Sequence, residues 1–251
     1  ALPLAQVLCS VYKSHLTLAN VMPARGTDGP SEDEGDLRIY LDHFLWQLRK
    51  LQLPAEAVRK DGPAAVGINS LAVEIKADLI VMSTHGMPGL DRLYAGDVAN
   101  RLIRILKTPL LLLRPTARWQ SRTSRFKKLL VCLDGSEAAE GVLRYARALA
   151  RTFGSEITLL SVPENESEHS GLETYLETVS QALRERGYQA SSLVMGSGAV
   201  RTILGVSASE KADLIMLTTH GRGRLERQAS VGSVTDLVID GANNPVFLVP
   251  V

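Results

Sequence analysis

The stretch KADLIVMSTHG, Lys76 to Gly86, returns as KADLIMLTTHG, Lys211 to Gly221, with eight of the eleven positions identical at a shift of 135 residues. In each copy a short apolar run, typical of a buried strand, ends in a Thr-His-Gly turn. A period this long indicates two domains in tandem, because solenoid repeats run to roughly 20 to 50 residues. The chain is therefore expected to contain two tandem copies of one domain.

The repeat extends beyond this stretch in both directions. Residues 142–162 align without a gap on residues 1–21 at a shift of 141, and residues 244–249 align on residues 108–113 at a shift of 136. These changes of shift give the first copy six more residues in a polar run, and the second copy one more residue between Gly221 and Gly232. Residues 126–141 have no counterpart, so we expect the first copy's initial strand and loop to precede Ala1.

Length, charge and cysteine usage exclude several classes of protein. A chain of 251 residues fits two domains of about 100 to 150 residues each. Its 28 basic and 27 acidic residues nearly balance, which argues against nucleic acid or an anionic membrane as the main partner. Cys9 and Cys132 have no CxxC spacing and indicate either a reducing compartment or simply buried thiols. With no apolar run near the roughly 20 residues of a membrane span, we expect a cytoplasmic protein.

Copy two alternates apolar strands with amphipathic helices. We expect strands at residues 128–133, 156–162, 190–195, 214–218 and 246–249, and helices from Glu137 to Thr152, at residues 172–186 and 200–211, and after Gly232. This alternation predicts right-handed parallel crossovers. The fold class is therefore α/β, with two tandem doubly wound parallel-sheet domains of Rossmann-like type.

The predicted domains are residues 1–114 and 126–251, joined by a polar, basic linker at residues 115–125. Each domain ends in a very apolar strand, at residues 110–113 and 246–249, that would be a bare edge in isolation. We expect these two strands to pair antiparallel about a pseudo-twofold axis. Trp46 and His43, on a helix of copy one, are interpreted as packing or surface residues rather than a site.

Two loops of copy two leave predicted strand ends with unusual chemistry. One is Asp134-Gly135-Ser136, and the other runs Thr218-Thr219-His220-Gly221 and returns through Gly232-Ser233-Val234-Thr235 to a helix. In open parallel sheets, ligands bind beyond the carboxyl ends of the strands, at the switch point in strand order. Glycines let the backbone approach a bulky anion, and amides at a helix start point toward it. The two loops together predict a phosphate-binding cradle.

At these residues the chain resembles the universal stress proteins, a superfamily of adenine-nucleotide-binding α/β domains, and the resemblance covers nearly the whole chain outside the linker. The family's phosphate signature is Gly, two residues, Gly, nine residues, Gly, then Ser or Thr. The resemblance implies binding of ATP, or of AMP or ADP, with Mg²⁺ possible beside the nucleotide, and a homo-oligomer. It implies a nucleotide site formed by Cys132, Leu133, Asp134, Val162, Leu217, Thr218, His220, Gly221, Gly232, Ser233, Val234 and Thr235.

Each copy departs from that signature in its own way. Copy two has Thr218 in place of the first glycine, and ten residues rather than nine before Gly232. Copy one has Ser83 at the first glycine and the regular spacing from Gly86 to Gly96, but Asp97 follows. Two unit charges about 4 Å apart repel by about 1 kcal/mol in water and about 4 kcal/mol at an effective dielectric of 20. A helix start contributes only about 0.3 to 1 kcal/mol, so we expect copy two to be the main site.

Several of these residues have a structural interpretation as well. Asp134 with Glu137 also fits a helix cap, and Gly232-Ser233 could simply start a helix. His85 and His220 fit a turn hydrogen bond better than a metal site. Three functions stay open: a stress-associated regulatory protein that binds ATP, a nucleotide-free dimerisation or interaction module with an unknown protein partner, and a weak ATPase. The last ranks lowest, because neither copy has a Walker lysine or an evident general base.

Overall fold

The computed structural model describes residues 1–22, 32–84, 97–114, 126–220 and 233–251, with the backbone alone for residues 32–38 and 233. These residues form two compact units, residues 1–77 and residues 78–251. The boundary falls inside the first sequence copy, just before its Asp78.

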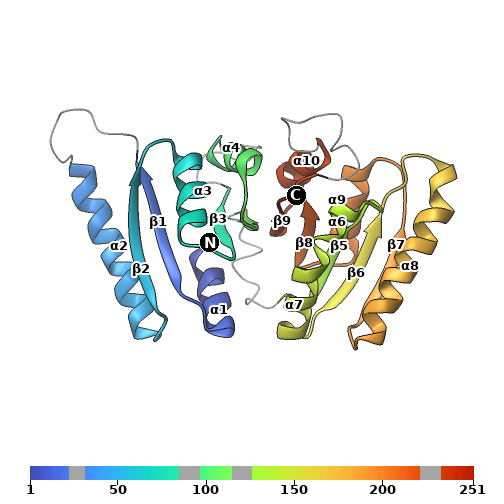
Figure 1. Ribbon diagram of the computed structural model, residues 1–251, viewed down its shortest axis with the longest axis horizontal. Coiled ribbons are helices and arrows are strands. Elements are labelled where there is room, and N and C mark those ends of the chain that lie inside the picture. The colour runs from blue at the N-terminus through green and yellow to red at the C-terminus, as the bar shows by residue number, and fades with distance from the viewer. Residues whose placement is uncertain (23–31, 85–96, 115–125, 221–232) are drawn as a thin grey trace. The chain divides into compact units, whose positions relative to one another are not determined.

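The larger unit contains a seven-stranded sheet in the order β3-β4-β9-β8-β5-β6-β7 (Figure 1). Its strands are β3 (Ile80–Ser83), β4 (Leu110–Leu113), β5 (Lys128–Cys132), β6 (Glu156–Ser161), β7 (Ala190–Val194), β8 (Leu214–Thr218) and β9 (Val246–Val249). Its helices are α4 (Asp97–Ile105), α6 (Glu137–Glu140), α7 (Leu143–Phe153), the 3₁₀ turn η1 (Glu166–Glu168), α8 (His169–Glu185), α9 (Ala199–Ser209) and α10 (Ser233–Gly241). All neighbouring strands pair parallel except β4 with β9. The predicted doubly wound α/β architecture is confirmed.

The antiparallel pairing of β4 with β9, expected from their apolar sequences, is also confirmed. Leu111 lies opposite Phe247, its own counterpart in the repeat, so the strand pair is locally two-fold symmetric. Every residue of both strands is buried. The pairing thus removes two apolar edges that would otherwise invite association with other chains.

The predicted helix from Glu137 to Thr152 is wrong in one respect, because the chain forms two helices there. α6 ends at Glu140, and Gly141 and Val142 separate it from α7. The amides of Gly141 and Val142 bond to carbonyls only three residues back, and glycine is a poor helix former. The end of α8 is as expected: Gly187 has φ of +83°, and the Gly187 and Tyr188 amides bond to Arg184 and Leu183 in a Schellman motif.

The smaller unit has the elements α1 (Leu2–Tyr12), β1 (Leu16–Met22), α2 (Glu32–Lys50), β2 (Ala55–Asp61) and α3 (Ala64–Glu74). β1 and β2 pair parallel, and Cys9, Leu48 and Leu53 form a core cluster beneath them. β1 corresponds to β6 of copy two, which lies between β5 and β7. Within the described residues β1 pairs with β2 alone, and its residues are mostly half-buried where those of β6 are mostly buried.

Candidate functional site

Strand β5 is the switch point of the sheet. It pairs in parallel with β6 on one side and β8 on the other, whereas the chain continues from β5 to β6 and β7 before crossing back to β8. The register places Val131 beside Met216 and Cys132 beside Leu160. The loops that follow β5, β6 and β8 therefore emerge side by side at one carboxyl edge, where ligands of such sheets bind.

The loop after β5 is held by the carboxylate of Asp134. Its Oδ1 accepts hydrogen bonds from the Ser136 amide at 2.9 Å and from the Ser136 hydroxyl at 2.6 Å. The Ser136 Oγ in turn accepts from the Ala139 amide at 3.2 Å, which makes Ser136 the N-cap of α6. The hypothesis that Asp134 itself caps the helix is therefore wrong. Gly135, at φ +81°, makes the turn that brings Asp134 and Ser136 together.

The base of this loop is tied to β6. Ser161, 1% exposed, donates a hydrogen bond from its hydroxyl to the Leu133 carbonyl at 2.6 Å. The Leu133 side chain is buried, and Val162, which follows β6, is half-buried. Burial raises the pKa of the Cys132 thiol to about 12, so this cysteine stays a protonated, weakly polar wall of the site. Sequence reasoning did not find Ser161, because its role depends on a contact 28 residues away.

Short-range hydrogen bonds hold the end of β8 and the two residues that follow it, Thr219 and His220. Leu217, Thr218 and Thr219 are all buried. Thr218 donates from Oγ1 to the His220 carbonyl at 2.7 Å, and the Thr219 hydroxyl lies 3.1 Å from His220 Nδ1. The side chain of Thr218, which stands where the family has glycine, therefore turns back into its own loop. His220 makes the structural turn contact that the sequence had suggested.

The start of α10 is joined to this turn. Thr235 is 4% exposed, and its hydroxyl donates to the Thr218 carbonyl at 3.2 Å. Val234 beside it is exposed at 36%. The helix begins at Ser233, as expected. The predicted site residues Gly221 and Gly232 lie outside the described residues.

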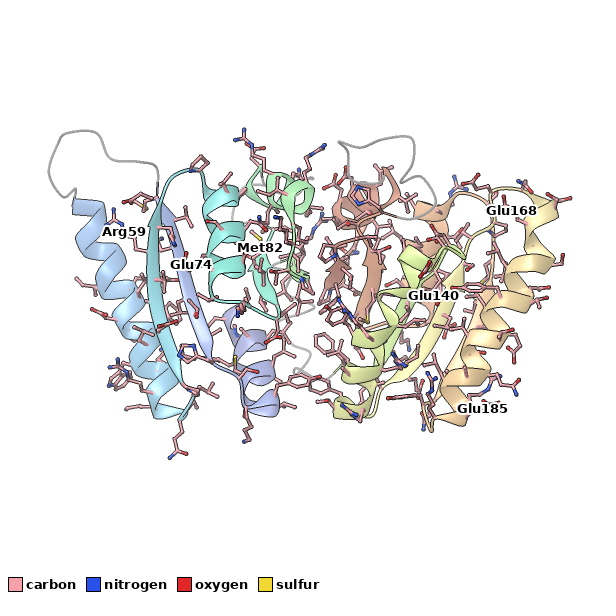
Figure 2. The ribbon with its side chains drawn as sticks, in the orientation of Figure 1. Arg59, Glu74, Met82, Glu140, Glu168 and Glu185 are labelled. Carbon is pink, nitrogen blue, oxygen red and sulfur yellow. The ribbon has the colours of Figure 1, made fainter. Side chains whose placement is uncertain are left out.

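A further contact beside the β5 loop was not predicted. Tyr175, on α8, donates from its hydroxyl to Oε1 of Glu140 at 3.1 Å, and Figure 2 labels Glu140 at this face of the unit. Burial, and then the negative charges of Glu140 and Asp134, raise the pKa of Tyr175. The Tyr175 phenol therefore remains a neutral donor near the Asp134 carboxylate. The two partners are 35 residues apart, and no local sequence pattern marks such a pair.

Thr84 of copy one makes the same backbone hydrogen bond as its counterpart Thr219. The Thr84 amide bonds to the Leu113 carbonyl at 2.9 Å, as the Thr219 amide bonds to Val249 at 2.9 Å. Asp97 begins α4, at the place where Ser233 begins α10. The remaining residues of the copy-one signature, among them His85, lie outside the described part of the chain.

The arrangement combines a held carboxylate, a helix start and apolar walls at one sheet edge. A carboxylate accepts hydrogen bonds from hydroxyl or amino groups, and a helix start favours an anion. Among the described residues, no group of three or more His, Cys, Asp or Glu side chains could hold a metal ion. None of the helices that the structure describes has the length and apolar character of a membrane span.

Comparison with known protein families identifies the family of the chain. The model of the Universal stress protein family matches twice, over residues 5–114 and 125–250. The chain belongs to the universal stress protein family. Universal stress protein MJ0531 of Methanocaldococcus jannaschii is 31% identical over 141 residues, which are 49% of this chain and 82% of that protein.

Solved structures of universal stress proteins share the fold over the whole chain. One from Archaeoglobus fulgidus has a TM-score of 0.76 at 18% identity and covers 98% of this chain and 91% of its own. One from Pseudomonas aeruginosa has a TM-score of 0.74 at 18% identity and covers 99% of this chain and 87% of its own. The tandem universal stress protein expected from the repeat is thus confirmed as to family and fold.

Proposed function

We propose that this universal stress protein binds an adenine nucleotide, ATP or its AMP or ADP forms, at the carboxyl edge of its second domain. The observation that carries the proposal is the position of Asp134. It lies at the switch point of the sheet, fixed by two hydrogen bonds from Ser136, beside the turn at Thr218–His220. Because the carboxylate is already held in place, it does not have to be ordered before it accepts hydrogen bonds from a ligand.

The two ends of the site suit the two ends of a nucleotide. Asp134 would accept hydrogen bonds from the ribose hydroxyls or the adenine amino group, with Cys132, Leu133 and Val162 as apolar walls. The phosphates would lie toward the start of α10, with Gly221, Gly232, Ser233 and the amides near Val234 as donors. Thr218, Leu217 and Thr235 would shape that end from beneath, since all three are buried. Mg²⁺ would arrive with the phosphates.

Other universal stress proteins have been solved with adenine nucleotides, one in complex with cAMP and one from Archaeoglobus fulgidus in complex with dAMP. Those ligands belong to those proteins. For this chain the support comes from its own residues at the second-domain edge. The first domain, residues 1–114, would bind poorly, because Asp97 places a negative charge where phosphate would lie.

The nucleotide would regulate rather than react. The described turns at residues 134–136 and 218–220 contain no lysine, and Oδ1 of Asp134 already accepts two hydrogen bonds from Ser136. Occupancy would instead bias a loop and an interaction surface, because the nucleotide would bind one of two conformations more tightly. We propose a stress-associated cytoplasmic protein that self-associates, with its second domain at residues 126–251 after a linker at residues 115–125.

A second candidate function is a nucleotide-free interaction module. It is favoured by one observation: the polar groups of the site satisfy one another, since Asp134 bonds to Ser136 and the Thr235 hydroxyl bonds to Thr218. A site of this kind is stable without any ligand.

The two candidates differ in what the purified protein carries. We would denature the protein and identify released small molecules by mass spectrometry, expecting ATP, ADP or AMP at a substantial fraction of one per chain. Asp134→Ala should abolish that signal. Asp213→Ala is the matched control, because Asp213 accepts two backbone hydrogen bonds, from Lys127 and Lys128, at the opposite end of β5. No nucleotide from the wild type, followed by no binding of added ATP, would favour the interaction module.

A further inference from the structure

Helix α2, labelled in Figure 1, carries an exposed stripe of apolar and aromatic side chains. The α2 stripe consists of Ile39, His43, Trp46 and Lys50, which recur at the three- to four-residue spacing of one helix face. Ile39 is 70% and Trp46 52% exposed. The rings of His43 and Trp46 are stacked with centroids 6.3 Å apart, and Lys50 Nζ lies 3.8 Å from the Trp46 ring centroid. An exposed tryptophan ordered by two neighbours is typical of the energetic centre of an interface.

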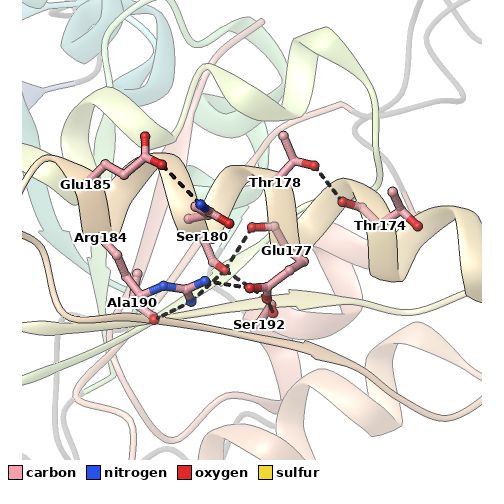
Figure 3. A network of polar contacts seen from close by, with 9 residues as sticks. Thr174, Glu177, Thr178, Ser180, Arg184, Glu185, Ala190 and Ser192 are labelled. Carbon is pink, nitrogen blue, oxygen red and sulfur yellow. Dashed lines mark hydrogen bonds and ion pairs between the residues drawn. The ribbon is translucent and has the colours of Figure 1, made fainter.

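The same face of the equivalent helix in copy two is polar. At the shift of 135 residues the α2 stripe corresponds to Thr174, Thr178, Gln181 and Glu185 of α8, all exposed. Figure 3 shows these residues bonded along the helix, with Thr178 donating to the Thr174 carbonyl at 2.8 Å and Gln181 donating to Glu185 at 3.1 Å. The fold therefore does not require apolar groups at these positions. Packing within its own domain therefore does not account for the α2 stripe.

The charges on either side of Trp46 are complementary to those of a second copy of the chain. Asp42 lies four residues before Trp46 and Lys50 four residues after it, and both are exposed. Two α2 helices packed antiparallel about a two-fold axis at Trp46 would set each Asp42 opposite Lys50 of the partner subunit. The contact is isologous, as most homodimer interfaces are. The apolar edges β4 and β9 are not available for it, because they already pair within the chain.

We propose that two copies of the chain dimerise through their α2 stripes, with the two Trp46 side chains in contact at the axis and two Asp42–Lys50 ion pairs flanking them. Lys50 would keep its place over Trp46 while its ammonium group reaches the partner's Asp42. This surface lies in the first domain, so the dimer is independent of nucleotide binding in the second.

The test is sedimentation equilibrium of the full chain across roughly 1 to 200 µM, a range that brackets ordinary homodimer affinities. The wild type should be dimeric at the upper end. A triple variant, Ile39→Thr with His43→Thr and Trp46→Gln, gives α2 the residues that copy two already tolerates, and it should weaken dimerisation at least about tenfold with an unchanged circular dichroism spectrum. A monomeric wild type at 200 µM would overturn the proposal and leave the α2 stripe to a different partner. An equally dimeric triple variant would overturn it too.

Charge exchange tests the predicted pairing itself. Asp42→Lys and Lys50→Asp should each weaken dimerisation at least about tenfold, and the double exchange should restore it, because opposite charges then face each other again. Glu177→Lys, at the position of α8 equivalent to Asp42, is the matched control and should leave self-association unchanged. Failure of the double exchange to recover the dimer would refute the antiparallel arrangement about Trp46.

Discussion

Two buried serines bracket β6, and their replacement separates stability from ligand binding. Ser161 donates to the Leu133 carbonyl at the carboxyl edge of the sheet, and Ser155 donates to the Phe126 carbonyl at the opposite edge. They are 1% and 4% exposed. Serine to alanine removes the donor in either case, and the loss of one such hydrogen bond costs about 0.5 to 1.5 kcal/mol. Each kcal/mol lowers Tm by about 2 to 4 °C in a chain of this size.

The two variants should differ in nucleotide affinity. Ser161→Ala removes the bond that ties Leu133, next to Asp134, to β6, so the loop that carries the carboxylate is held less firmly, and ATP affinity should fall about tenfold, equivalent to about 1.4 kcal/mol. Ser155→Ala should lose comparable stability and keep its ATP affinity, because Phe126 lies at the far end of β5. The assays are calorimetric unfolding and isothermal titration with ATP at 25 °C. Equal ATP affinity in both variants would refute the reasoning that Ser161 positions the site.

Three further predictions concern other side chains. Cys132 is half-buried by solvent exposure, but because desolvation raises its pKa to about 12, a thiol-reactive disulfide at pH 8 should label it far more slowly in the folded protein than in urea; equal rates would contradict the raised pKa. The hydrogen bond from Arg184 (Figure 3), followed by that from Ser192, lowers the pKa of Glu177, so its contribution to stability is present above the unfolded-state pKa near about 4.3 and is lost as pH falls through the folded value. Glu177→Gln should accordingly lower Tm more at pH 7 than at pH 3, and a pH-independent difference would argue against the ionised pair. Asp97→Ser should tighten ATP binding to the first domain, most visibly at low salt; unchanged binding would point instead to Ser83 or the pocket's shape.

The order of elements could be predicted because apolar runs and helical periodicity are local signals. Every strand expected in copy two is present, and the pairing of β4 with β9 followed from the near absence of polar residues in them. The break at Gly141 was missed because the flanking residues keep a helical pattern across it. A pattern of period 3.6 does not report where two short helices meet.

The site was less predictable, because its contacts join segments far apart in the sequence. The motif located Asp134 and Thr218, but not that Ser136 holds the former or that Thr218 turns into its own loop. Tyr175 and Ser161 reach the site through bonds that span 35 and 28 residues. Only the fold brings them there, and neither stands in a motif.

The number of ATP molecules bound per chain is the most direct test of nucleotide binding at the second domain. In an isothermal titration of nucleotide-free protein, we expect one site per chain, retained in Asp213→Ala and lost in Asp134→Ala. Two equal sites, or one site that survives Asp134→Ala, would contradict the assignment of the nucleotide to the second domain's carboxyl edge.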